Sequence, residues 1–335
     1  MKVRFAPLRI PRARRLQTAA VLQWVLTFLL SVQICFMVMW LLIIFNCWFL
    51  YIPYLAWMYL DWRTPEQGGR KSTWVQSWTV WKHFNDYFPI RLIKTQDLDP
   101  GHNYIFGYHP HGILVAGAFG NFCTSYSDFK KLFPGLSVYS HILPLVFGCP
   151  FFREYVLSTG LVSVSRRSVS YVLSKQGGGN VSMIILGGAQ EALVSNPGRF
   201  TVFIRQRKGF VRLALIHGAS LVPLFSFGEI ELFKQINNTK GSWLRTIQDI
   251  VRKYTGLALP IFYGRGIFQY NFGIMPYRKP IHTVVGRPIH VQQTPHPTPE
   301  QVDELHQTYM EELKALFDKH KGKYGIPEHE TLTFT

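Results

Sequence analysis

The hydrophobic pattern divides the chain into an apolar segment near the N-terminus and a longer mixed region. Residues 16–60 contain no Lys, Arg, Asp or Glu, and only seven of them are polar. As one straight helix this segment would be about 68 Å long, whereas the hydrocarbon core of a bilayer is about 30 Å thick. The segment therefore predicts two membrane helices, or a re-entrant hairpin, with a turn near Asn46.

Both flanks of this apolar segment are basic. Residues 1–15 contain six Lys or Arg and no acidic residue, and three more basic residues follow the segment by residue 71. Basic flanks favour the cytosolic side of a membrane, and the segment is too long for a cleaved signal peptide. We therefore expect a basic cytosolic N-terminus at residues 1–15, a membrane hairpin at residues 16–60 and a cytosol-facing domain at residues 61–335.

The pattern after residue 60 alternates between strand-like and helix-like pieces. One helix-like stretch, residues 210–217, ends at Gly218, and near the C-terminus Thr298, Pro299 and Gln301 form a capping pattern before helically spaced apolar residues. Short apolar runs that predict strands lie at residues 104–108, 161–164, 183–186, 221–225 and 283–285. The expected fold class is α/β, with flanking helices on a mixed sheet.

Composition and charge narrow the class of partner. Apolar residues make up 47% of the chain and charged residues 16%, below the roughly 25% typical of soluble domains. The net charge of +17 favours anionic surfaces or ligands, such as an acidic membrane or a phosphorylated co-substrate. We expect no nucleic-acid partner, because the charge is spread over both flanks of a membrane hairpin. The four cysteines form no C-x-x-C pair, which argues against a disulfide framework or zinc site.

Two histidines follow the first strand-like run, in the motif His109-Pro110-His111-Gly112. Catalytic residues in α/β proteins often lie where strands end, and proline restricts the backbone on both sides of its peptide bond. A zinc site with this spacing usually has an Asp and another His soon after the motif, but no acidic residue lies between His111 and Asp128. The motif therefore favours a histidine general base without a metal, and a pair of hydrogen-bonded turn histidines is the alternative.

A histidine base needs a partner that holds its tautomer. The best carboxylate candidate is Glu191, which follows an apolar run and two glycines, Gly187 and Gly188, whose N–H groups could face an oxyanion or simply form a turn. A serine nucleophile is not indicated, because the chain contains no G-x-S-x-G motif. A nucleophilic Cys123 or Cys149 stays open, although buried apolar cysteine is commoner.

A basic cluster lies before the stretch that ends at Gly218. Arg205, Arg207 and Lys208 precede the start of a predicted helix. Arginine suits bidentate phosphate contacts, and a helix N-terminus adds its dipole. These residues predict an anion site, with a solvated cationic face as the alternative.

Four short motifs, taken in their order along the chain, indicate a resemblance to a known family. They are His-Pro-His-Gly at 109–112, Gly-Gly-Ala-Gln-Glu at 187–191, Arg-Lys-Gly-Phe at 207–210 and Phe-Gly-Glu at 227–229. Behind a basic-flanked apolar hairpin, this order resembles the type-2 diacylglycerol acyltransferase family, particularly its monoacylglycerol acyltransferase branch, over essentially the whole chain. One departure is Ile230, where relatives usually have Asn, and it weakens a role for that loop.

The resemblance implies a glycerolipid-acyltransferase-like fold and transfer of an acyl group from acyl-CoA to a 2-monoacylglycerol, at the endoplasmic reticulum and lipid droplets. It implies no cofactor, since acyl-CoA is a co-substrate. Diacylglycerol or a long-chain alcohol is the alternative acceptor, and a membrane-hairpin scaffold is the non-enzymatic alternative. Oligomerisation with itself or with other lipid-synthesis enzymes stays open.

Within this resemblance we expect His111 to be the base and Glu191 to orient it. His109 would position the acceptor or share the base role, and Arg205, Arg207 and Lys208 would hold the CoA phosphates. The aromatic stretch at residues 74–88 suits either the membrane interface or the core.

Overall fold

A seven-stranded mixed sheet forms the centre of the molecule in the computed structural model, which describes residues 3–236, 238–239 and 241–335. The strand order is β1-β10-β7-β2-β5-β3-β4. β10 is antiparallel to β7 and parallel to β1, while the other neighbours are parallel. The bounds are β1 (Ile90–Lys94), β2 (Tyr104–His109), β3 (Ser137–Ile142), β4 (Leu161–Ser163), β5 (Asn180–Ile185), β7 (Ser220–Phe227) and β10 (Ile281–Val285). The predicted α/β class with a mixed sheet is confirmed.

Helices cover the sheet and follow several of the predicted runs. All five predicted strands are present, whereas β1 and β3 were missed because polar or basic residues interrupt their apolar positions. The helices of the domain are α3 (Thr73–Gln76), α4 (Thr79–Tyr87), α5 (Ala116–Phe122), α6 (Phe129–Leu132), α7 (Phe152–Ser158), α8 (Arg166–Leu173), α9 (Gly188–Ala192), α10 (Gly209–His217), α11 (Trp243–Thr255) and α12 (Pro299–His320). Short pairs join β6 (Thr201–Val202) to β11 (Thr333–Phe334) and β8 (Lys234–Gln235) to β9 (Phe262–Tyr263).

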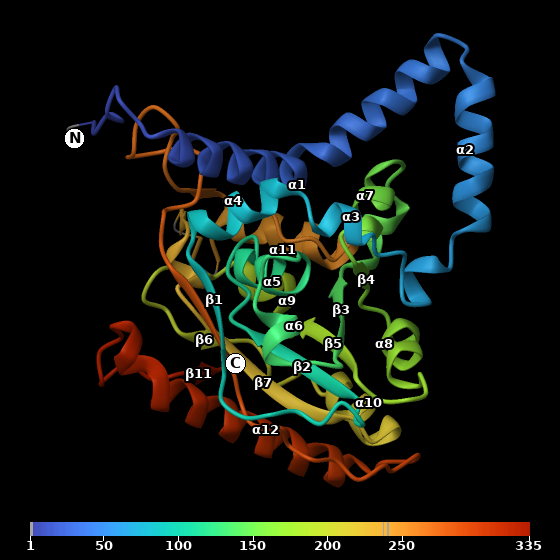
Figure 1. Cartoon of the computed structure of the whole chain (residues 1–335), viewed down its shortest axis with the longest axis vertical. Helices are drawn as coiled ribbons and strands as arrows, with labels where there is room; N and C mark the ends of the chain where they lie inside the picture. Colours follow the sequence, from blue (N-terminus) through green and yellow to red (C-terminus); the bar gives the residue numbers. More distant parts are fainter. Residues whose placement is uncertain (1–2, 237, 240) are drawn as a thin grey trace.

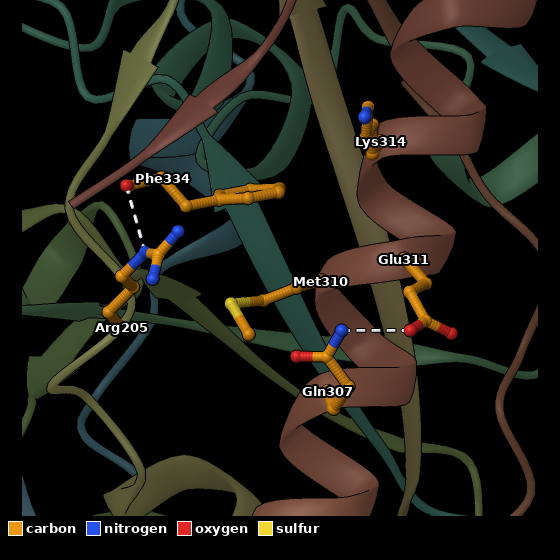
Figure 2. Close-up of a pocket in the computed structure, with 6 residues that line it drawn as sticks. All are labelled: Arg205, Gln307, Met310, Glu311, Lys314 and Phe334. Carbon is orange, nitrogen blue, oxygen red and sulfur yellow. Dashed lines mark hydrogen bonds between the residues drawn. The ribbon is translucent and has the colours of Figure 1, made fainter.

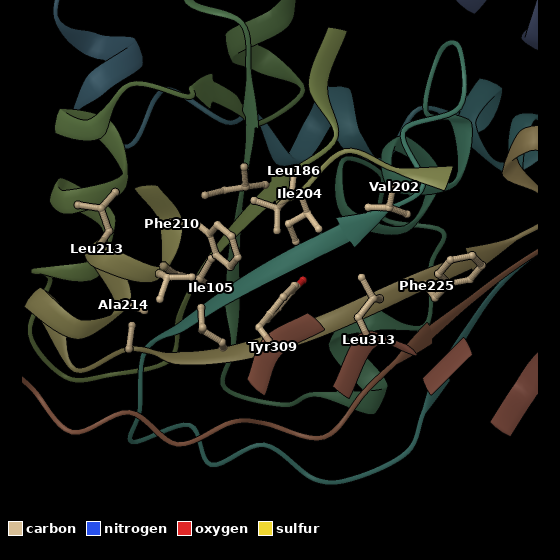
Figure 3. Close-up of a cluster of buried hydrophobic side chains, with 14 of the residues drawn as sticks. Ile105, Leu186, Val202, Ile204, Phe210, Leu213, Ala214, Phe225, Tyr309 and Leu313 are labelled. Atoms are coloured by element: carbon tan, nitrogen blue, oxygen red, sulfur yellow. The ribbon is translucent and has the colours of Figure 1, made fainter. Parts of the chain in front are cut away.

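The C-terminal helix α12 forms as its sequence predicts. The Thr298 hydroxyl accepts from the backbone N–H of Gln301, whose side chain accepts from the Thr298 N–H, so the capping box is complete. The inner face of α12 packs on the sheet, and Figure 3 shows Tyr309 and Leu313 within a cluster of buried side chains. Burying such side chains contributes about 1.5–3 kcal/mol each.

The apolar N-terminal segment forms two helices, α1 (Arg12–Ile44) and α2 (Trp48–Leu60). They join around Asn46, whose positive φ of 54° reverses the chain there. The first part of α1 packs on α4, where Trp24 is fully buried and its ring lies 5.0 Å from that of Phe84. In Figure 1 the rest of α1 rises away from the domain and α2 runs back towards it. The first part of the predicted hairpin therefore belongs to the core of the domain.

The exposed part of this segment differs from the aromatic stretch after it. Among the described residues, α1 is the one helix long and apolar enough to cross a membrane, and no residue of α2 is buried. In the stretch at residues 74–88, by contrast, Trp81, Phe84, Tyr87 and Phe88 are buried. Core packing, rather than the membrane interface, is the correct interpretation for these four residues.

Candidate active site

His109 is the last residue of β2 and lies in the core. Its ring is fully buried, and Nε2 lies 3.1 Å from the hydroxyl of Tyr309 on α12. That hydroxyl donates to the Gly107 carbonyl at 3.2 Å, so it accepts from His109 Nε2. Burial lowers the pKa of His109 to about 3. His109 is therefore a neutral ring held by a hydrogen bond inside the domain.

His111, two residues later, lines a cavity of about 900 Å³. Its Nδ1 lies 3.2 Å from the carbonyl oxygen of Gly112. Burial lowers the pKa of His111 to about 4, so the ring is neutral at pH 7. A neutral ring whose Nδ1–H donates to this carbonyl has an unprotonated Nε2. Nε2 is therefore the ring nitrogen that is free to accept a proton.

Glu191 on α9 holds the backbone of the histidine turn. It is buried, and its two oxygens accept from the backbone N–H groups of His111 at 2.5 Å and Phe203 at 2.9 Å. Burial raises the pKa of Glu191 to about 7. Gly187 makes room for this carboxylate, because a Cβ there would lie 2.0 Å from a Glu191 oxygen. Sequence reasoning expected Glu191 to hold the ring, whereas its contact is with the backbone.

A second buried carboxylate, Glu229, lies next to the same turn. One of its oxygens accepts from the Gly117 N–H at 2.9 Å and from the Tyr108 hydroxyl at 3.0 Å, and burial raises its pKa to about 7. Gly112 has a φ of +61°, and a Cβ there would lie 3.0 Å from the Glu229 side chain. The doubt that Ile230 raised about this loop does not extend to Glu229, which packs directly against the turn.

The three predicted phosphate-binding cations are divided by the fold. Arg207 and Lys208 line the cavity with His111, and Lys208 also pairs with Asp303 at 2.5 Å. Arg205 does not: its Nε donates to the Phe334 carbonyl at 3.0 Å, beside a separate hollow of about 270 Å³ (Figure 2). The expectation that all three act together is therefore corrected to the pair Arg207 and Lys208.

Three further cations that sequence reasoning did not select also line the cavity. They are Arg166 at the start of α8, Arg212 on α10 and Arg252 on α11. The four-residue spacing from Lys208 to Arg212 places both on one side of α10, and this signal could have found Arg212. No local sequence pattern marks Arg252, because only the tertiary packing of α11 brings it to the cavity. None of the described lining residues is acidic, so the cavity suits an anionic ligand.

The rest of the cavity wall is largely apolar. Trp24 and Phe28 of α1 contribute to it, as does Cys123. Burial raises the pKa of Cys123 to about 12, which disfavours a nucleophilic thiolate. Gly188, with a φ of +57°, also lines the cavity beside the Arg207 guanidinium. Among the described residues, no three His, Cys, Asp or Glu side chains gather as metal ligands would.

Comparison with known proteins places this chain in a family. A model of the family described as diacylglycerol acyltransferase matches residues 40–335. The chain is 69% identical over 334 residues to 2-acylglycerol O-acyltransferase 1 of Bos taurus, covering 100% of both chains. The Homo sapiens protein of that name is 68% identical over 332 residues, with 99% of both covered.

Two further likenesses are more distant. Diacylglycerol O-acyltransferase 2 of Homo sapiens is 49% identical over 320 residues, which cover 95% of this chain and 82% of that protein. The crystal structure of a 1-acyl-sn-glycerophosphate acyltransferase from Thermotoga maritima has 14% identity and a TM-score of 0.36, covering 90% of this chain and 97% of its own. The family match and the full-length identities confirm the resemblance read from the four motifs: the chain belongs to the diacylglycerol acyltransferase family.

Proposed function

We propose that this protein transfers a fatty acyl group from acyl-CoA to a hydroxyl of a 2-monoacylglycerol, giving diacylglycerol. The observation that carries the proposal is the cavity, where a neutral His111, a group of cations and an apolar wall meet. The full-length identity to proteins named 2-acylglycerol O-acyltransferase 1 supports the choice of acceptor.

The proposed chemistry is a direct transfer with His111 as general base. His111 Nε2 takes the proton of the acceptor hydroxyl while that oxygen attacks the thioester carbonyl carbon. The carbon–sulfur bond then breaks, and the departing CoA thiolate takes the proton from the imidazolium. Such base catalysis typically contributes about 10²–10⁴-fold in rate. The step needs neither an acyl-enzyme nor a cofactor.

The surrounding groups would hold the reactants. Glu191 keeps the backbone of His111 in place through its hydrogen bond. Gly188 lines the cavity, and its backbone N–H would face the oxyanion that develops at the thioester carbonyl. Arg207, Lys208 and the three further arginines would bind the phosphates of CoA, since arginine matches phosphate oxygens in bidentate fashion. His109 would act through the turn, because its ring hydrogen-bonds to Tyr309 rather than lining the cavity.

We propose that the α1/α2 hairpin enters the bilayer and returns to the same side. Val32 and Cys35 of α1 still pack against the core of the domain. The part of α1 beyond them, residues 36–44, is about 14 Å long and α2 is about 20 Å long, both less than the roughly 30 Å hydrocarbon core. The basic flanks suit one cytosolic face. Location at the endoplasmic reticulum and lipid droplets is part of this proposal, and imaging the tagged protein with organelle markers tests it.

An acceptor competition tests the proposed reaction. The full-length protein in phospholipid nanodiscs receives labelled acyl-CoA with 2-monoacylglycerol, diacylglycerol and a long-chain alcohol at equal surface density. We expect labelled diacylglycerol to form fastest. Faster labelling of the diacylglycerol acceptor or of the alcohol would assign a different acceptor, and no labelling by a folded protein would favour the scaffold alternative.

A further inference from the structure

Helix α11 carries a stripe of exposed apolar side chains. Trp243, Ile247, Ile250 and Tyr254 follow one another at intervals of four, three and four residues, which places them on one side of the helix. Their exposed fractions are 75%, 51%, 51% and 81%. We call these four residues the outer stripe. A helix on the surface of a soluble domain normally presents its polar side to solvent, so this arrangement requires an explanation.

The side of α11 that faces the protein is polar and tightly bonded. Arg245 is buried and pairs with Asp249 at 3.1 Å. Gln248 is also buried: its Nε2 donates to the Leu259 carbonyl at 2.9 Å, and its Oε1 accepts from Asn238 Nδ2 at 2.9 Å. Rotating the outer stripe inward would break these bonds and strand buried polar groups. The helix is therefore held with its apolar side outward.

The same helix forms part of the wall of the active-site cavity. Arg252 lines the cavity, as do Leu257 and Ala258 just after the helix, together with Trp24 and Phe28 of α1. Figure 1 places α1, α2 and α11 in the upper half of the molecule, whereas α12 crosses the opposite end. Helices α1 and α11 therefore both contribute to the wall of one cavity, whereas the four residues of the outer stripe do not line it.

Apolar exposure continues beyond α11. Leu259 and Ile261 are exposed in the segment that follows it. Phe268 is 80% exposed, and its carbonyl accepts from the Ala6 N–H at 2.8 Å, next to Phe5, which is also exposed. Several separate segments thus present exposed apolar side chains. A broad planar lipid surface fits this distribution better than one protein partner.

We propose that the outer stripe of α11 lies in the boundary between headgroups and acyl chains of the bilayer that the hairpin enters. The occupant is a phospholipid membrane, since Trp and Tyr suit this depth, Lys253 next to the stripe can reach headgroup phosphates, and the net charge of +17 complements anionic lipids. The helix would thereby separate lipid on one side from the cavity on the other. This membrane contact does not depend on the proposed reaction.

Fluorescence quenching tests the position of Trp243. The full-length protein and its Trp243→Phe variant are placed in nanodiscs with or without phosphatidylcholine brominated in its acyl chains. The difference between their tryptophan fluorescence intensities gives the signal of Trp243. Ala315→Trp serves as the matched control, because Ala315 is exposed on α12 at the opposite end. We expect brominated lipid to quench the Trp243 signal by at least half, as measured by the difference intensity, and to leave the signal at position 315 unchanged.

Two other outcomes would overturn the proposal. Quenching of Trp243 by aqueous acrylamide alone, to the same extent as at position 315, would show that the stripe faces water. Protection from both quenchers would show that a protein, such as a second copy of this chain, covers it. Neither result depends on turnover, so each is distinguishable from failure of the proposed reaction.

A charged substitution on the stripe gives a second readout. Ile250→Asp leaves the buried polar side of α11 intact, so the variant should fold. Burial of the Ile250 side chain in lipid would contribute free energy to membrane binding, and the substitution removes it. We therefore expect KM for acceptor in vesicles to rise about tenfold. For acceptor in detergent micelles, kcat should be unchanged. Ala315→Asp, which adds the same charge on α12, should change neither. An unchanged KM for Ile250→Asp would contradict the membrane contact.

Discussion

His109 and His111 are two residues apart, but the fold gives them different environments. His109 ends β2 and hydrogen-bonds to Tyr309 in the core, whereas His111 lines the cavity. On a continuous strand, residues two apart would share one face. Here the strand ends at His109 and the chain turns at Pro110, so the two rings separate. Position in a motif therefore does not identify the base.

Arg205 and Arg207 repeat this contrast. Both precede α10, but Arg207 lines the cavity while Arg205 donates to the Phe334 carbonyl at a separate hollow. In each pair the fold assigns one side chain to the cavity and leaves the other to the surrounding structure. Substituting the members of each pair separately therefore tests the assignments directly.

The largest effect is expected for His111→Ala. Loss of the general base should lower kcat by about 10²–10⁴-fold, measured with labelled acyl-CoA and 2-monoacylglycerol in nanodiscs. Circular dichroism and membrane flotation should match the unaltered protein. If a folded His111→Ala variant keeps its turnover, the base is another group.

Glu191→Gln should have the next largest effect. The amide keeps the shape of the side chain but replaces one acceptor by an N–H₂ group, which then faces the backbone N–H of His111 or Phe203. Losing a charge-assisted hydrogen bond costs about 1.5–3 kcal/mol, so we expect kcat to fall roughly ten- to a hundredfold. A normal kcat would mean that this carboxylate is not needed to position the turn.

The pH dependence of kcat sharpens the role of Glu191. Protonation below its pKa of about 7 removes one acceptor, so activity should rise with pH through that value. The His111 ring is already neutral there, since its pKa is about 4. Glu229 has a pKa that is also about 7, so its protonation should still lower kcat at low pH in the Glu191→Gln variant. We therefore expect kcat of the variant to fall less steeply below pH 7 than kcat of the unaltered protein. An unchanged fall would exclude protonation of Glu191 as its cause.

The two arginines should differ in acyl-CoA binding. Removing a charge-assisted phosphate contact in Arg207→Ala should raise KM for acyl-CoA about tenfold. Arg205→Ala should leave that KM unchanged, because its side chain lies outside the cavity. Initial rates over a range of acyl-CoA concentrations measure both values, and equal increases would contradict the division of the cluster.

Tyr309→Phe should have the smallest effect on turnover. It removes the hydroxyl that joins His109 to the Gly107 carbonyl, which costs about 1 kcal/mol of stability. We expect a lower thermal unfolding midpoint in detergent and a kcat within about threefold of the unaltered protein, as for a residue outside the cavity. A large loss of kcat in a stable variant would give His109 a part in the chemistry.

Much of the fold could be predicted from the sequence because its signals are local. Alternation and apolar runs predicted five of the seven strands of the central sheet, and the capping pattern at Thr298 predicted the start of α12. The strands β1 and β3 were missed because neighbours, rather than their own residues, complete their burial. Trp24 was assigned to lipid because an apolar side chain has the same pattern whether it packs against lipid or against α4.

The candidate site was predictable in its residue types but not in its contacts. His111, Glu191, Arg207 and Lys208 were selected from motifs and do lie at or beside one cavity. Arg252 and Glu229 come from segments far along the chain, and their distance from His111 in the sequence carries no signal of contact. Sequence spacing also could not tell that Glu191 binds a backbone N–H rather than a ring.

The sequence by itself determined the fold class, the apolar hairpin, the family and the chemical groups available, because periodicity, charge and motif order depend on neighbouring residues. Only the tertiary structure decided which histidine meets the cavity, which arginine leaves it and which side of α11 faces outward. These features depend on where strands end and on which distant segments pack together, and such contacts are set by burial of the whole chain rather than by local pattern.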